Sequence, residues 1–193
     1  MEAARVSAIL LAAGLSRRME GRDKLRLVYG GMTLLERAVR LLDSLPFYEK
    51  ILVTAPARFC GIALPPSVRT VMNPFPEDGQ SGSVRLGVSA ASGKWYLFLM
   101  ADQPRLSAEN LLPLLALARE NDKIIFPTVN GRPCSPTLFP ARFRAELLSL
   151  TGDTGGRTVR EAHPEACLGL EVKYPNDFRD IDSESDYTAL GDE

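Results

Sequence analysis

The segment 6–12 (VSAILLA) is almost uninterruptedly apolar and ends shortly before Gly14. A run of this length bounded by a glycine is typical of a strand that is buried on both faces of a parallel sheet. A short buried helix would have a similar composition, so periodicity alone leaves both interpretations open. Glu2 precedes the run and Arg17 and Arg18 follow it, and this charge pattern argues against an exported leader peptide.

Short apolar runs and helical patterns alternate over the next part of the chain. Thr33 and Glu36 have the spacing of a capping box, and the apolar residues that follow as far as Leu45 recur on one helical face. Further strands are predicted at 51–54, 70–72, 95–100 and 124–128, and further helices at 83–91 and 108–120. Such alternation predicts an α/β fold with a mostly parallel sheet and helices on both of its faces.

The pattern changes after residue 128. Asn130 and Gly131 predict a turn, prolines interrupt the following residues, and a helix is expected over about 140–150. We interpret this region as a small insertion over the sheet. A late strand is expected at 167–173, and Ser183 with Asp186 can cap a short terminal helix. Since the chain has 193 residues, of which 45% are hydrophobic, a single domain over 1–193 is expected.

Composition excludes several classes of protein. The net charge is −1 and acidic and basic residues are mixed along the chain, so no extended field would attract nucleic acid or an anionic membrane. No apolar segment approaches the ~18–20 residues of a membrane span. Cys60, Cys134 and Cys167 form no CxxC pair, which argues against a disulfide framework and a zinc site. We expect a cytoplasmic protein that is a monomer or a weak dimer.

The segment 11–24 (LAAGLSRRMEGRDK) is the first candidate site, because a buried strand here gives way to a loop of small residues. Small side chains let backbone N–H groups approach phosphate oxygens, and nearby cations such as Arg17 and Lys24 offset the phosphate charge. The GxxxxGK[ST] and GxGxxG patterns are absent, so a P-loop and a dinucleotide fingerprint are disfavoured. A solvated basic loop is the alternative interpretation.

The segment 95–104 (WYLFLMADQP) is the second candidate, because an apolar strand delivers Asp102 to its carboxyl end. Open α/β sheets bind ligands at the carboxyl ends of their strands, where a magnesium-binding carboxylate is expected. An Asp in this place is also common as a turn or helix-cap residue. Pro104 and Ser107 already supply turn and cap chemistry, which favours another role for Asp102.

Several motifs occur together in a fixed order. LAAGLSRRM with a following Lys, a later Asn-Pro with GQSGSVRLG, then ADQP, GRPCSP and a terminal DIDSESDY resemble the MobA-like NTP transferases. The resemblance covers nearly the whole chain and is closest to the molybdenum cofactor cytidylyltransferase type, including accessory proteins of molybdenum hydroxylases. It implies a three-layer Rossmann-like nucleotidyltransferase fold. A nucleotide-binding half would span about 1–128, and an acceptor-side half with a C-terminal metal loop would span 129–193.

The resemblance also implies roles for individual residues. Arg17, Lys24 and Asp102 would be catalytic, and Asp102, Asp180 and Asp182 would bind the metal. The residues implied for nucleotide binding are Leu11, Ala12, Ala13, Gly14, Ser16, Arg17, Lys24, Asn73 and Ser83. The residues implied for acceptor binding are Gly131, Pro133, Gly152, Asp153 and Arg157. An ordinary surface turn is the alternative for 180–182 and for the GDTGGR segment at 152–157.

The implied reaction suits these residue types. Attack on the α-phosphorus of an NTP brings two anionic groups together, so the barrier is lowered by orientation and by cations that neutralise charge. A phosphate monoester has a second pKa near ~6, so it is already a nucleophile at neutral pH and needs no general base. His163, the one histidine, has no obvious partners in sequence and is expected at the surface or at a helix end.

One position departs from the family pattern: Glu20 follows Met19 where the family usually has Gly, which puts the geometry of 20–23 in question. LAAG favours the cytidylyl branch, whereas the loop length from Met19 to Lys24 is closer to guanylyltransferases. We expect Mg²⁺-dependent transfer from an NTP, with CTP preferred over GTP, to a molybdopterin-type acceptor. A molybdenum hydroxylase is the expected client.

Two other functions stay open. The same fold can serve a sugar- or alcohol-phosphate nucleotidyltransferase, since fold does not determine the acceptor. A non-catalytic cofactor-binding accessory protein for a molybdenum hydroxylase is the third hypothesis, and Glu20 near the triphosphate loop is the feature that favours it.

Overall fold

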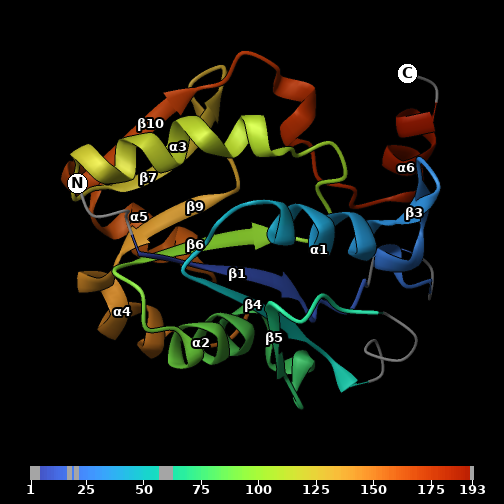
Figure 1. Ribbon diagram of the computed structural model, residues 1–193, viewed down its shortest axis with the longest axis horizontal. Helices are drawn as coiled ribbons and strands as arrows, with labels where there is room; N and C mark the ends of the chain where they lie inside the picture. The colour runs from blue at the N-terminus through green and yellow to red at the C-terminus, as the bar shows by residue number, and fades with distance from the viewer. Residues whose placement is uncertain (1–4, 17–18, 20–21, 57–62, 192–193) are drawn as a thin grey trace.

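The computed structural model describes residues 5–16, 19, 22–56 and 63–191 (Figure 1). Arg17, Glu20 and Cys60 therefore lie outside the described residues. Within these ranges, no helix has both the length and the apolar character needed to cross a membrane.

A mostly parallel sheet forms the centre of the molecule. Its strands lie in the order β10 (Cys167–Glu171), β7 (Ile124–Val129), β9 (Thr137–Pro140), β6 (Trp95–Met100), β1 (Val6–Ala12), β4 (Glu49–Thr54) and β5 (Val68–Met72), and β8 (Arg132–Pro133) pairs with β7. β9 and β8 are the antiparallel members. A separate hairpin joins β2 (Val28–Tyr29) and β3 (Met32–Thr33).

The first apolar run is a strand and not a helix. Every residue of β1 is buried, and β1 pairs in parallel with β4 on one side and β6 on the other. The one polar member, Ser7, is satisfied because its hydroxyl donates to Glu49 and accepts from the Gly93 N–H over 2.9 Å. The central position of β1 explains why its sequence is continuously apolar.

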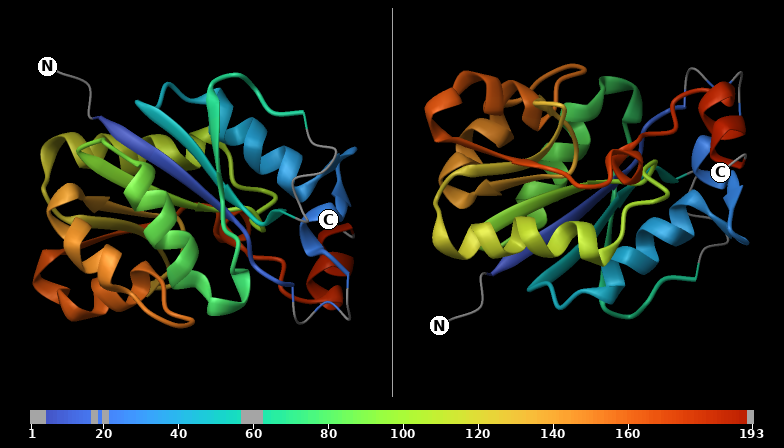
Figure 2. Two further views of the ribbon diagram at one scale, coloured as in Figure 1. Left: turned by 90° about the horizontal axis from the view of Figure 1, so that it is seen from below. Right: turned by 90° about the horizontal axis from the view of Figure 1, so that it is seen from above.

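Helices cover both faces of the sheet, as the views from above and below show (Figure 2). The α-helices are α1 (Leu34–Ser44), α2 (Gln80–Ala90), α3 (Ala108–Glu120), α4 (Arg144–Ser149), α5 (Gly156–Ala162) and α6 (Glu184–Gly191). Short 3₁₀ turns are η1 (Lys24–Arg26), η3 (Pro76–Asp78), η4 (Ala141–Phe143), η5 (Pro164–Ala166) and η6 (Pro175–Phe178). Alternate residues of β1 divide the core: Leu10 packs in the cluster that includes α1 and α3, and Ile9 packs in the cluster that includes α2, α4 and α5.

The predicted helix caps are present. Thr33 Oγ1 accepts from the Glu36 N–H at 3.2 Å, and Glu36 Oε2 accepts from the Thr33 N–H at 2.8 Å. Ser183 and Asp186 make the equivalent pair of bonds at the start of α6, over 3.2 and 2.8 Å. Both caps satisfy N–H groups that a helix leaves without an intrahelical partner.

The region after residue 128 differs from its prediction. We expected an insertion over the sheet, but β9 lies inside the sheet, where it pairs with β6 and β7. The expected helix at 140–150 is reduced to η4 and the short α4, because Pro140 ends β9 and the next turn is a 3₁₀ turn. Leu138 and Phe139 of β9 are fully buried, and prolines at the ends of this short apolar segment hid it in the sequence.

Four further elements were placed wrongly or missed. α2 begins at Gln80, earlier than the predicted Ser83, because Gly79 is its N-cap. The β2–β3 hairpin is too short to show alternation, and α5 begins at Gly156, within the GDTGGR segment. The predicted halves, 1–128 and 129–193, meet in one sheet, since β9 lies between β6 and β7.

Candidate functional site

A cavity of about 510 Å³ lies at the carboxyl ends of β1 and β6. This volume is within the range of about 300–1,000 Å³ that small-molecule sites occupy. Five segments that are separate in sequence line it: the residues at the end of β1 and after it, the residues before α2 and at its start, the end of β6 with the residues after it, the pair Gly152 and Asp153, and Asp182. The parallel sheet thus places the two candidate segments of the sequence at one site.

The loop after β1 is shaped by its own polar contacts. Ala12 and Ala13 are buried, whereas Gly14 and Leu15 are exposed at the cavity. Ser16 has a positive φ of 51°, and its hydroxyl accepts from the Lys24 N–H over 3.2 Å. This bond ties the small-residue loop to the start of η1 and fixes where the Lys24 side chain begins.

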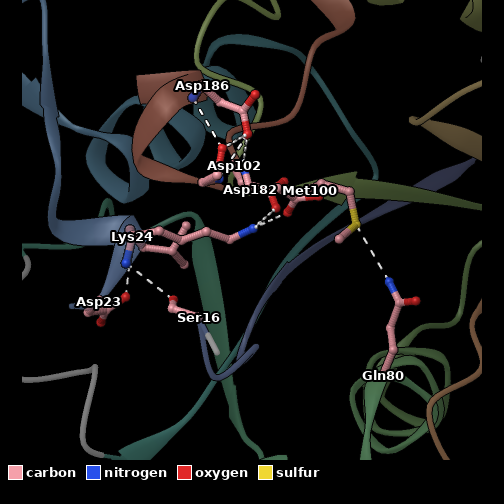
Figure 3. Close-up of polar contacts among 10 residues, drawn as sticks. Ser16, Asp23, Lys24, Gln80, Met100, Asp102, Asp182 and Asp186 are labelled. Carbon is pink, nitrogen blue, oxygen red and sulfur yellow. Dashed lines mark hydrogen bonds and ion pairs between the residues drawn. The ribbon is translucent and has the colours of Figure 1, made fainter. Parts of the chain in front are cut away.

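Lys24 joins two carboxylates from distant parts of the chain (Figure 3). Its ammonium contacts Asp102 Oδ2 and also lies 3.1 Å from Asp182 Oδ1. The side chains of Lys24 and Asp102 are only 15% and 11% exposed, while that of Asp182 is 46% exposed. Burial alone would lower the pKa of Lys24, but the charges and hydrogen bonds of Asp102 and Asp182 together outweigh burial and raise that pKa. Lys24 is therefore a cation in contact with both carboxylates.

The C-terminal loop reaches this cluster through its backbone. The Ile181 N–H donates to the Asp102 carbonyl oxygen over 2.9 Å, and the Asp182 N–H donates to Asp186 Oδ2 over 3.2 Å. Ile181 itself is buried and anchors the loop in the core. Asp182 is therefore held between the end of β6 and the start of α6.

Asp180 lies on the other side of this loop. It lines a small recess with Arg105 and Arg179 and is not among the residues that line the main cavity. Surrounding protein atoms desolvate its carboxylate, and the charges of Asp102 and Asp182 repel it, which raises the pKa of Asp180 to about 7 although the residue keeps exposed surface.

The acidic residues can be tested as ligands for a divalent cation. Asp102 Oδ1 is buried and accepts no hydrogen bond from any described residue. Carboxylate oxygens suit Mg²⁺, which commonly uses one or two protein carboxylates and completes its shell with substrate phosphates and water. Across the described ranges, no group of three or more His, Cys, Asp or Glu is placed to hold a metal. Asp102 and Asp182 offer the one or two carboxylates that such a cation commonly uses.

The start of α2 forms another wall of the cavity. A loop that is distant in sequence fixes this end of the helix through hydrogen bonds. Asp153 Oδ1 accepts from the Gln80 N–H over 3.2 Å, and the Gly152 carbonyl accepts from the Ser81 N–H over 3.4 Å. Gly79 has a φ of 92°, and a Cβ on it would lie 2.6 Å from the Gly152 carbonyl oxygen. This close approach lets Gly152 and Asp153 cap a helix whose N-cap residue has no side chain.

Asn73 and Ser83 form a pair beside this wall. Asn73 Nδ2 donates to Ser83 Oγ over 3.0 Å, and Asn73 Oδ1 accepts from the Phe75 N–H over 3.0 Å. Ser83 lines the cavity, whereas Asn73 is 2% exposed and is not a lining residue. Asn73 thus contacts the site through Ser83.

Most of the residues that the sequence singled out meet at the cavity. The predicted residues that line it are Leu11, Ala12, Ala13, Gly14, Ser16, Lys24, Ser83, Asp102, Gly152, Asp153 and Asp182. Asn73, Asp180, Gly131, Pro133 and Arg157 do not line it. Gly131 lies in the turn after β7, where its N–H donates to Glu171, and Arg157 is an exposed residue paired with Glu161 over 2.7 Å.

One wall of the cavity consists of residues that were not predicted from the sequence. This wall consists of Pro76, Glu77, Asp78, Gly79 and Gln80, and Met100 lines the cavity at the end of β6; none of them was assigned a role. Gly79 and Gln80 open the motif GQSGSVRLG, so the family resemblance was the signal that could have found them. The η3 turn carries no motif of its own, and only the fold shows that it borders the site.

His163 is at a helix end, as expected, but it has partners that the sequence did not show. It caps the C-terminus of α5, and its Nε2 lies 2.7 Å from Glu146 Oε2. Nδ1 lies 3.6 Å from Glu165 Oε1. The hydrogen bond to Glu146 raises the pKa of His163; desolvation opposes this rise, and the charges of Glu146 and Glu165 add to it.

Comparison with known proteins places this chain in a family. Residues 8–167 match the MobA-like NTP transferase domain. The chain is 29% identical to Purine catabolism protein PucB of Bacillus subtilis (strain 168) over 94% of each chain. It is 25% identical to Molybdenum cofactor guanylyltransferase of Vibrio atlanticus (strain LGP32), over 95% of this chain and 94% of that one.

A solved structure agrees with the fold. A nucleotidyl transferase from Methanothermobacter thermautotroptrophicus superposes with a TM-score of 0.80 at 24% identity, over 97% of this chain and 96% of that chain. The matched domain contains both the loop after β1 and the end of β6, the two segments that the cavity brings together. The chain belongs to the MobA-like NTP transferase family, a family of nucleotidyltransferases.

Proposed function

We propose that this protein transfers a nucleoside monophosphate from an NTP, with CTP preferred, to the phosphate of molybdopterin or molybdenum cofactor. The observation that carries the proposal is the contact of Lys24 with Asp102 and Asp182 at the wall of the 510 Å³ cavity. A cation and two carboxylates that face a loop of small residues suit a triphosphate and its magnesium ion.

The residues would divide the work as follows. Backbone N–H groups of the loop from Ala12 to Ser16 bind phosphate oxygens, and Lys24 neutralises charge on the transferring and leaving groups. An oxygen of the acceptor phosphate attacks the α-phosphorus, and the bond from that phosphorus to the bridging oxygen of pyrophosphate breaks. The acceptor phosphate is already ionised, so no protein base is required.

Asp102 and Asp182 would hold Mg²⁺, which supplies charge neutralisation for the triphosphate when it is bound. Lys24 keeps the two carboxylates together through its ammonium group. Because the Lys24 pKa is raised, this group stays protonated throughout the physiological range.

The choice of nucleotide and acceptor is supported by similarity to relatives. The loop sequence LAAG supports CTP through the family resemblance. The relative from Vibrio atlanticus is named for the molybdenum cofactor and for guanylyl transfer; its name supports the acceptor, and GTP is the competing nucleotide in the test below. A cytoplasmic location and a molybdenum hydroxylase client remain predictions.

The test is pyrophosphate release measured with each of the four NTPs, with and without molybdopterin, in the presence and absence of Mg²⁺. We expect release that needs both Mg²⁺ and molybdopterin and is fastest with CTP. Pyrophosphate release with sugar phosphates but not with molybdopterin would show that the acceptor is a sugar phosphate. Tight binding of CTP and molybdopterin without any release would favour the non-catalytic accessory function.

A further inference from the structure

Gln80 lines the cavity, and its side-chain carboxamide makes few hydrogen bonds within the described part of the protein. Lys24 and Gln80 approach the end of β6 from two sides (Figure 3). Among the described residues, the carboxamide makes one hydrogen bond, from Nε2 to Met100 Sδ over 3.8 Å. A thioether sulfur is a weak acceptor, so this N–H can be redirected to a stronger acceptor at little cost.

The loop that caps α2 also fits closely around Gln80. A Cβ on Gly155 would lie 2.3 Å from Gln80 Oε1 and 2.9 Å from its Cδ. The Gln80 N–H is bound by Asp153. Gly155 leaves room for the Gln80 side chain, and Asp153 fixes the backbone from which that side chain projects.

The direction of the reaction indicates what Gln80 would contact. In phosphoryl transfer the attacking and leaving oxygens lie roughly in line with the phosphorus. If the loop after β1 and Lys24 hold the pyrophosphate, the acceptor approaches from the side that Gln80, Gly152 and Asp153 line. Glu77 and Asp78 also line the cavity, so Gln80 supplies an uncharged donor in a region that otherwise carries negative charge.

We propose that Gln80 binds the acceptor by donating its Nε2–H to an oxygen of the acceptor phosphate, and that Gly155 is a positioning residue that acts through Gln80. The inference rests on the proposed function. As the bond from the acceptor oxygen to the α-phosphorus forms, the bond from that phosphorus to the pyrophosphate oxygen breaks. Gln80 neither takes nor gives a proton in this step.

Two variants separate the amide from its position. Gln80→Met keeps the length of the side chain and removes the donor, and Gly155→Ala keeps the donor and displaces it. Each is expected to raise the KM for molybdopterin about 10-fold and to leave the KM for CTP unchanged, because a hydrogen bond to a charged group is lost. The double variant should be no worse than Gln80→Met, since Gly155 acts through Gln80. Ser89→Ala, at the exposed far end of α2, is the matched control.

Other results would overturn the inference. A raised KM for CTP alone would mean that Gln80 contacts the nucleotide, and unchanged constants would mean that it contacts neither substrate. Calorimetric titration with molybdopterin, in the presence of a non-hydrolysable CTP analogue, measures the affinity of wild type and of Gln80→Met for the acceptor. This comparison does not require turnover. If wild-type protein binds molybdopterin but transfers no nucleotide, the proposed function is wrong, whereas the role of Gln80 in binding is still tested by the affinities. If wild type and Gln80→Met bind molybdopterin with equal affinity, the role of Gln80 is wrong, and the proposed function is unaffected.

Discussion

The backbone N–H of Ile181 donates a hydrogen bond to the carbonyl oxygen of Asp102 over 2.9 Å. This bond joins the C-terminal loop to the end of β6, and Ile181 is buried next to it. Asp182, the following residue, is thereby brought to Lys24. The acidic side of the site is assembled by a tertiary contact and not by a contiguous motif.

Replacing either member of the Lys24–Asp102 pair should abolish most turnover. We expect Lys24→Ala and Asp102→Ala each to lower kcat/KM for pyrophosphate release by at least ~10²-fold, because each removes charge stabilisation from the transition state. Steady-state kinetics well below the melting temperature gives the measurement, and circular dichroism checks that the fold is intact. Wild-type rates in both folded variants would rule the mechanism out.

Gly79→Ala should destabilise the protein and disturb the cavity wall. Gly79 has φ 92° and ψ −175°, a region that is essentially restricted to glycine. A Cβ there would also lie 2.6 Å from the Gly152 carbonyl oxygen. We expect a loss of at least about 1–3 kcal/mol in the free energy of unfolding, measured by urea denaturation. Gly191→Ala is the control, since a Cβ there meets nothing within 4 Å; equal effects of the two changes would contradict this account.

Thr33→Ala should weaken α1 without touching the cavity. The change removes the side-chain acceptor for the Glu36 N–H and breaks the capping box. The expected cost is about 1 kcal/mol in the free energy of unfolding. Thr33→Ser keeps the hydroxyl and should stay close to wild type in the same denaturation experiment. A Thr33→Ala protein as stable as the Ser variant would show that the cap adds nothing measurable.

The His163–Glu146 pair should make stability depend on pH. The pKa of His163 is raised above its ordinary value of 6.5 in the folded protein, so the native state holds this proton more tightly than the unfolded chain does. The stabilisation is fully present below pH 6.5 and is lost as the pH rises through the raised pKa.

Glu146→Gln tests that dependence. The variant should melt at a lower temperature than wild type near pH ~5.5, and the difference should vanish near pH ~9, where the histidine is neutral in both states. Glu165→Gln is the comparison, because Glu165 lies 3.6 Å from the ring and Glu146 lies 2.7 Å from it. A difference that is constant across this pH range would exclude the ion pair as its cause.

Local patterns predicted the elements whose signals are contained in one segment. The apolar run of β1, the capping box of α1 and the cap of α6 all formed where the sequence indicated, because backbone and side-chain preferences act over a few residues. β9 and α5 were missed, since the strand becomes regular only through pairing with β6 and β7, and the helix is short and begins at a glycine.

The sequence by itself determined the mostly parallel α/β fold, the family, and the two segments that carry Lys24 and Asp102. Only the tertiary structure decided which residues meet, because contacts between Lys24 and Asp182, or between Gln80 and Gly155, join residues whose separation in sequence leaves no periodic trace. Their geometry follows from strand order and from single backbone hydrogen bonds such as that between Ile181 and Asp102. Local propensities do not encode such contacts, whereas packing of the whole sheet does.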